Sequence, residues 1–487
     1  MRTKSVDMLS GSITKGLLAM AVPIMIMNVM QSLFNIIDMT VLRVFEDDGA
    51  VGAVGACGML ITLCTSLLIG ISTGANVTVA RRLGGGNSER ASRAVMTAIL
   101  FSVIAGIVLM VVGLTFAETF LKMTNCPTGL LPRAVLYFRF YFCGVPIFML
   151  YNFCASILRA TGDTKRPMYF LILGGIIKVI LTLFFVTAFK MSVKGVALAT
   201  ILSNLVACSL AFYVIAKGQD VVYVDFKRIK MEMAELKDML FIGIPAGFQS
   251  ALYSLANVVI TTVVNSFGAD ATTGIAIANQ FDGILYQISY APSLAVTPYI
   301  AQNIGAGNIK RVKQTLLRAA LITTAFGATF GALSAIFSGQ LSSIMSSTPA
   351  VIAFSRQKMI IISSTYFICG INEVMGGVLR GMGKPIVPTI ATFIFMCLLR
   401  FVWVYAIFPL CPNLTFLYTV WPVGWILSIM TLLAVYFPAI SKLQRKSARV
   451  PEINRVCPDG QVNFTKELAS KPSVPHRKEY RKMSKSI

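Results

Sequence analysis

Residues 321–337 read LITTAFGATFGALSAIF, a run without a single charged side chain. A strand of a membrane barrel would instead alternate polar and apolar residues over about ten positions. This run is continuous and rich in small residues, which indicates a helix packed against other helices in a bilayer. We therefore interpret it as part of one membrane-spanning helix.

Comparable apolar runs recur along almost the whole sequence. The chain has 487 residues, of which 56% are hydrophobic and only 13% charged, whereas soluble domains usually carry about a quarter charged residues. Runs of about 18 or more apolar residues are long enough to cross a bilayer as helices. We predict an all-α membrane protein with twelve transmembrane helices, at 16–43, 50–80, 91–118, 133–158, 164–189, 193–216, 238–266, 270–303, 312–337, 352–380, 386–408 and 415–439.

The distribution of Lys and Arg predicts the orientation of these spans. If the N-terminus is cytoplasmic, 33 of the 43 Lys and Arg residues fall in inner segments and 7 in outer segments, Lys358 among the latter. The positive-inside rule therefore predicts that both termini are cytoplasmic. The same rule accounts for most of the formal charge of +23, so we expect no nucleic-acid partner.

The sequence also contains an internal duplication. Three blocks of the first half recur in the second: RRLGGGNSERASRAV (81–95) as QNIGAGNIKRVKQTL (302–316), LRATGDTKRP (158–167) as LRGMGKPIVP (379–388), and PIMIMNVMQSLFNIID (23–38) as PAGFQSALYSLANVVI (245–260). The offset is 221 residues for the first two blocks and 222 for the third. Because six spans are an even number, the two halves form parallel six-helix repeats (6+6).

The duplication divides the chain into predicted parts. These are an N-terminal six-helix lobe (1–216), a cytoplasmic linker (217–237), a C-terminal six-helix lobe (238–440) and a basic, disordered cytoplasmic tail (441–487). Parallel repeats of this kind are found in some secondary transporters, which bind substrate between the repeats and alternate access by rocking them. We therefore expect a transporter rather than a static scaffold.

The two halves differ at their intramembrane acids. Asp38 in the first half aligns with Ile260 in the second, and Glu373 in the second half aligns with Asn152 in the first. A carboxylate at membrane depth is costly and by default functional. Each half therefore has its own acid in a different helix, and we expect the halves to have different roles.

The run QSLFNIID (31–38), the GGGN and GAGN loops and the two LRxxG loops together resemble the multidrug and toxic compound extrusion (MATE) family. The likeness covers residues of about 10–440. It implies a cation-coupled exporter in which protons or sodium enter while an amphipathic, usually cationic, compound leaves. It also implies that Asp38 matches the cation-site aspartate of the first span and that Glu373 matches an acid found in the tenth span of some members.

Two departures from the family pattern leave the coupling ion open between H⁺ and Na⁺. In the fifth span, Lys178 and Thr182 stand where members often have Asn and Asp. In the seventh span, Tyr253 stands where the sodium-coupled branch often has Glu. The resemblance therefore implies an incomplete proton site in the first half and an incomplete sodium site in the second.

Acids and bases within the predicted spans are equal in number. They are Asp38, Asp282, Glu373, Arg139, Lys178 and Arg400. Because an unpaired charge in hydrocarbon is costly, we predict the pairs Asp38–Lys178 and Glu373–Arg400. Asp38 and Glu373 are the predicted cation-coupling residues, and a fixed ion pair that holds helices together is the alternative for each. Arg139 and Arg400 are expected to orient their neighbours rather than to bind cargo.

Further polar residues complete the predicted site. Asn35, Asn152, Asn257 and Asp282 are supporting polar positions, and Tyr141, Tyr151, Tyr253 and Gln249 are candidates for the substrate cavity. Aromatic faces suit flat cationic compounds through cation–π contacts. The expected partners are small organic cations or amphipathic drugs together with membrane lipid.

Several other functions lack the residues that they need. The single histidine, His476, lies in the tail, so we expect no histidine-based metal site, no cofactor and no enzyme activity. The GGGN loop lacks the Gly-Lys-Ser/Thr ending of a phosphate loop, which argues against ATP drive. We predict a monomeric multi-pass antiporter of the plasma (inner) membrane; the alternative is a lipid-linked oligosaccharide flippase of the same superfamily.

Overall fold

The computed structural model describes residues 5–45, 48–124, 126–218 and 230–448. Within these ranges the regular elements are all helices. The first half contains α1 (Ile13–Phe45), α2 (Asp48–Gly84), α3 (Ser88–Met123), α4 (Leu131–Cys143), α5 (Val145–Ala160), α6 (Lys165–Thr187) and α7 (Ser192–Ala216). The second half contains α8 (Met233–Asn265), α9 (Ala269–Gly305), α10 (Ile309–Ile336), α11 (Ser338–Met345), α12 (Pro349–Ser363), α13 (Tyr366–Gly381), α14 (Ile386–Thr392), η1 (Phe393–Leu398), α15 (Leu399–Val402), η2 (Trp403–Ile407), η3 (Phe408–Leu410), α16 (Leu414–Tyr418) and α17 (Val420–Ala448).

Residues 1–447 form one compact unit, and the second unit, Ala448–Ile487, falls almost entirely outside the described residues. Helix α17 continues to Ala448, so the beginning of the predicted disordered tail is helical. Most of the predicted linker and of the tail lies outside the described ranges.

The described helices include many that can cross a membrane. Eight are long and apolar enough on their own, and the bent pairs α4–α5 and α12–α13 raise the number to ten. Helices α8 and α9 are also long, with 33 and 37 residues, but are not among these ten. The protein is therefore a helical, multi-pass membrane protein.

Two predicted spans, 133–158 and 352–380, are bent rather than straight. Helices α4 and α5 meet at an angle of 46°, and α12 and α13 at 49°. The first bend lies at Gly144, just before a proline at the start of α5; proline lacks the N–H that would continue the helical ladder. The second bend lies at Ser364 and Thr365, and no proline lies next to it in the sequence.

The duplicated loops share one backbone geometry. Gly86 and Gly307 both have φ of +71°, a left-handed conformation that glycine adopts without steric cost. The next residues, Asn87 and Asn308, each cap a helix by accepting a hydrogen bond from the backbone N–H three residues later, at 2.9 and 3.1 Å. Asparagine is a preferred residue for such caps, so the sequence repeat recurs as a structural repeat.

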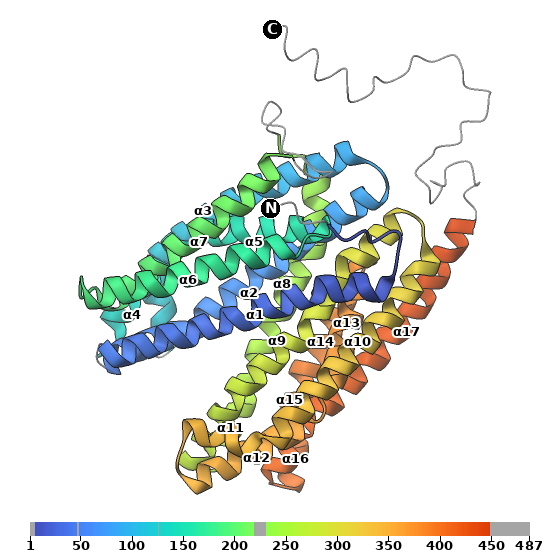
Figure 1. The fold of residues 1–487 in the computed structure, drawn as a ribbon. Helices are drawn as coiled ribbons and strands as arrows, with labels where there is room; N and C mark the ends of the chain where they lie inside the picture. Colours follow the sequence, from blue (N-terminus) through green and yellow to red (C-terminus); the bar gives the residue numbers. More distant parts are fainter. Residues whose placement is uncertain (1–4, 46–47, 125, 219–229, 449–487) are drawn as a thin grey trace, which may run out of the picture. The chain divides into compact units, whose positions relative to one another are not determined.

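Helix α2 of the first half packs closely along α8 of the second half (Figure 1). A Cβ atom added to Gly70 would lie 2.1 Å from the Cα of Gly247. Farther along α2, a Cβ atom on Gly84 would lie 2.0 Å from the carbonyl oxygen of Gln302 in α9. Glycine permits such close approach of two helix backbones in a membrane protein.

The segment before α1 contacts both halves of the protein. The N–H of Val6 donates to the carbonyl of Gly162, between α5 and α6, at 3.0 Å. On the other side, the Asn303 side chain donates to the carbonyl of Met8 at 3.0 Å. The Arg311 guanidinium donates to three backbone carbonyls of the same segment at 2.6 to 3.0 Å. The segment therefore links the α5–α6 loop to α9 and α10.

Candidate functional site

The first candidate centre surrounds Asp38 in α1. The carboxylate is 7% exposed, and its Oδ2 lies 2.5 Å from Nζ of Lys178 in α6. Its Oδ1 accepts a hydrogen bond from the Thr182 hydroxyl, one turn further along α6, at 3.3 Å. Because α1 and α6 pack together, the predicted Asp38–Lys178 pair is present within the protein interior.

The second candidate centre surrounds Glu373 in α13, which is 3% exposed. Its Oε1 accepts hydrogen bonds from the hydroxyls of Tyr253 in α8, at 3.1 Å, and Tyr286 in α9, at 3.4 Å. The predicted Glu373–Arg400 pair is wrong, because Arg400 instead donates to Oδ1 of Asn257 at 2.6 Å. Within the described residues, two phenol groups rather than Arg400 donate hydrogen bonds to this carboxylate.

The positions at which the sequence departs from the family pattern are the positions that contact the two acids. Lys178 and Thr182 both bind Asp38, and Tyr253 binds Glu373. Each buried carboxylate thus has polar partners from a second helix. A buried polar group needs such partners, because leaving it unpaired in an apolar environment is costly.

A third acid, Asp282 in α9, is partly buried and pairs with a base that the sequence analysis placed in an outer segment. Oδ2 of Asp282 lies 2.8 Å from Nζ of Lys358 in α12, which also donates to Asn279. Lys358 is 3% exposed and was wrongly placed in an outer segment, although it lies inside the predicted span 352–380. Arg139, which the sequence analysis counted among the bases within the spans, is exposed on α4.

Two buried arginines near the ends of α5 and α13 were also missed as interior residues. Arg380 donates to Oε1 of Gln249 at 2.9 Å and to the hydroxyl of Ser293 at 3.2 Å. Its counterpart in the first half, Arg159, donates to the hydroxyl of Ser156 at 2.6 Å. The LRxxG motif marks both arginines, but a count of loop charges assigned them to inner segments.

The remaining predicted site residues lie in varied surroundings. Tyr151 is buried and donates to the carbonyl of Pro167 at 3.2 Å, and the hydroxyl of Tyr141 lies 3.5 Å from that of Thr65.

The predicted amide side chains also differ in their surroundings. Gln249 donates to Thr392 at 3.0 Å, in addition to its contact with Arg380. The side chain of Asn152 donates to the carbonyl of Phe148 at 2.8 Å. Asn35 is exposed on α1. Several of the predicted cavity residues therefore bind other protein groups, and the two carboxylate centres are the better defined sites.

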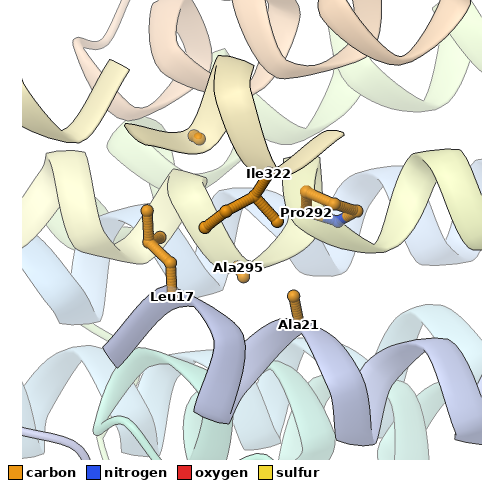
Figure 2. Close-up of a pocket in the computed structure, with 6 residues that line it drawn as sticks. Leu17, Ala21, Pro292, Ala295 and Ile322 are labelled. Carbon is orange, nitrogen blue, oxygen red and sulfur yellow. The ribbon is translucent and has the colours of Figure 1, made fainter. Parts of the chain in front are cut away.

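A narrow apolar crevice lies between α1, α9 and α10 (Figure 2). Its lining residues are Leu17, Ala21, Pro292, Ala295, Ala319 and Ile322. The crevice offers no charged or hydrogen-bonding side chain, so we do not assign it to ion binding. Among the described residues, no group of three or more His, Cys, Asp or Glu side chains could hold a metal ion.

Comparison with known families adds to this geometry. The MatE family model matches residues 23–184 and again residues 245–406, and the starts of the two matches are separated by the 222-residue offset of the repeat. The chain belongs to the MatE family. The MATE resemblance inferred from the sequence motifs is thereby confirmed.

Individual MATE relatives agree with this assignment. The chain is 26% identical to "Probable multidrug resistance protein YoeA" of Bacillus subtilis, over 78% of this chain and 83% of that protein. It is 27% identical to the "FAD transporter" of Shewanella oneidensis, over 66% of this chain and 72% of that protein. A solved structure, "Outward-facing conformation of a multidrug resistance MATE family transporter of the MOP superfamily", covers 91% of this chain and all of its own, with a TM-score of 0.84 and 19% identity.

Proposed function

We propose that this MATE-family protein is a secondary antiporter. It exports amphipathic or cationic organic compounds in exchange for H⁺ or Na⁺, by alternating access between two six-helix lobes. It acts as a transporter and not as an enzyme, and it works as a monomer in the plasma membrane with lipid around it. Curated relatives named as multidrug resistance proteins support the multidrug cargo.

The proposed topology has twelve spans and cytoplasmic termini. Ten spans come from the eight apolar helices and the two bent pairs. Helices α8 and α9 supply the other two, because each is longer than the roughly 20 residues that a bilayer requires.

The observation that carries the proposal is the buried carboxylate of Asp38 within the apolar helix α1. Its side chain binds one base and one hydroxyl within the described residues, Lys178 and Thr182. A carboxylate in this position can hold a proton, a sodium ion or an ammonium group, and a cation that occupies it displaces Lys178. Two cations that compete for one carboxylate are coupled by linkage, which is the requirement for exchange.

The flippase alternative receives no support from the relatives described above. One relative is named as a multidrug resistance protein and another as a FAD transporter, so the names do not agree on one cargo. Family membership therefore supports organic cargo without fixing its charge.

Dye efflux from vesicles tests the proposal. Purified protein is reconstituted, and a sodium gradient and a proton gradient are imposed separately while a fluorescent cation is followed. We expect one of the two gradients to drive the dye in the direction opposite to the ion, so that dye accumulates on the side from which the ion flows. Equal dye distribution under both gradients, with protein shown to be folded and inserted, would contradict antiport.

A further inference from the structure

The two halves carry cations at corresponding positions of the repeat. Lys178 follows Pro167 by eleven residues, and Arg400 follows the matching Pro388 by twelve. Between Pro388 and Arg400 lies η1, a π-helical stretch, whose hydrogen bonds each enclose one more residue than those of an α-helix. The extra residue is therefore taken up in η1, and Arg400 stands in the second half where Lys178 stands in the first.

The backbone around Arg400 is irregular on both sides. Arg400 lies in α15, which has four residues and is flanked by the π-helical stretches η1 and η2. Its counterpart region in α6 is a continuous α-helix. Stretches of π-helix are rare and occur frequently at functional sites, so the second half departs from the first at this position.

The acid that neutralises the cation in the first half is absent from the second. Lys178 pairs with Asp38, but the residue that aligns with Asp38 is Ile260. Arg400 is 2% exposed and donates to the neutral amide oxygen of Asn257. Within the described residues no carboxylate contacts it. A buried guanidinium with only a neutral acceptor retains a strong preference for an anion.

An aromatic ring and an exposed amide lie beside this cation. The Trp421 ring centroid is 4.9 Å from the Arg400 guanidinium carbon and 6.0 Å from Nζ of Lys358. Lys358 is neutralised by Asp282, whereas Arg400 is not. Asn257 is exposed and Trp421 is partly exposed, so a ligand that displaces the Asn257 amide reaches Arg400 directly.

We propose that Arg400, Asn257 and Trp421 form a subsite for the carboxylate group of an aromatic cargo. The planar guanidinium can donate two parallel hydrogen bonds to a carboxylate, and Trp421 supplies a face for the adjoining ring. This inference rests on the proposed transport function. It extends the proposed cargo to aromatic compounds that carry a carboxylate, which are zwitterionic or anionic.

A matched pair of dyes tests the subsite. Rhodamine 110 carries a free carboxylate, and rhodamine 123 is its methyl ester; both are measured for binding to purified protein by fluorescence anisotropy and for efflux from vesicles. We expect wild-type protein to bind rhodamine 110 at least about tenfold more tightly than rhodamine 123, as a charge-assisted bidentate hydrogen bond implies.

Two variants and one control complete the test. Asn257→Asp supplies the missing acid without removing a buried charge, so it is expected to fold and to abolish the binding preference for rhodamine 110 over rhodamine 123. Arg400→Lys keeps the charge but loses the planar fork and should weaken rhodamine 110 binding by about tenfold. Arg139→Gln, at an exposed arginine, should change neither dye.

The outcomes separate this inference from the antiport proposal. Loss of both dyes to the same extent in Asn257→Asp, or a wild type without preference for the carboxylate, would overturn the subsite, since Arg400 would then serve the transport cycle or the fold alone. If the preference appears in binding but neither dye is exported under any gradient, the subsite stands and the antiport proposal fails.

Discussion

At the scale of single residues, substitution can separate two roles of the Asp38–Lys178 pair. One role is to couple transport to a cation, and the other is to hold α1 and α6 together. Asp38→Asn leaves Lys178 buried without its acid, and removal of one partner from a buried ion pair costs about 3–5 kcal/mol. We therefore expect low expression and a lower Tm for Asp38→Asn. The double variant Asp38→Asn with Lys178→Met should recover the Tm but show no gradient-driven efflux, measured in the vesicle assay.

The control for this pair lies on the same helix. Asn35→Ala changes an exposed residue of α1 and should keep both the Tm and the coupled efflux within error. Gradient-driven efflux by the double variant at the wild-type rate would show that Asp38 is not the coupling residue.

The sequence predicted some of these residues and missed others for a physical reason. Lys178 lies near the middle of its predicted span, where a charge must find a partner, so its pairing with Asp38 could be inferred. Arg380 lies at the end of its predicted span, where a long side chain can extend to either water or protein. The direction of such a side chain depends on its three-dimensional neighbours, which one sequence does not reveal.

At the scale of helices, the close contact between α2 and α8 makes a sharp prediction. Gly70→Ala would place a methyl group 2.1 Å from the Cα of Gly247, and relieving such overlap typically costs about 1–3 kcal/mol. Gly55→Ala lies on the same helix with nothing within 4 Å of the added atom, and alanine favours a helix over glycine by up to about 1 kcal/mol. We expect a lower Tm for Gly70→Ala and an unchanged or higher Tm for Gly55→Ala, measured by thermal unfolding of purified protein. Equal Tm values for the two variants would contradict the contact.

Helix existence was easier to predict than helix shape. Apolar length identified the eight helices and the two bent pairs that can cross a membrane, because a bilayer sets a minimum length. The bend between α12 and α13 and the π-helical stretches around Arg400 involve no Pro or Gly at the irregular positions. These irregularities leave hydropathy unchanged, so they depend on packing against neighbouring helices and could not be inferred from composition.

At the scale of the whole molecule, the twelve-span proposal assigns each loop to one side of the membrane. Single cysteines are introduced at Thr128, Asn87 and Asn308 in a background without the ten native cysteines; all three positions are exposed. A membrane-impermeant thiol reagent added to whole cells should label position 128, whereas positions 87 and 308 should react only after the membrane is opened. If positions 87 and 308 label from opposite sides, the two halves cannot be parallel repeats.

The segment before α1 has a consequence for the time course of synthesis. Met8 emerges first from the ribosome, but its partners Asn303 and Arg311 follow 295 and 303 residues later. At about 5–20 residues per second, the segment waits on the order of 15–60 s before it can dock. Its docking on α9 and α10 therefore requires synthesis past residue 311: a nascent or truncated product that ends before residue 303 lacks these contacts, and its N-terminal segment is more open to proteases and quality-control factors.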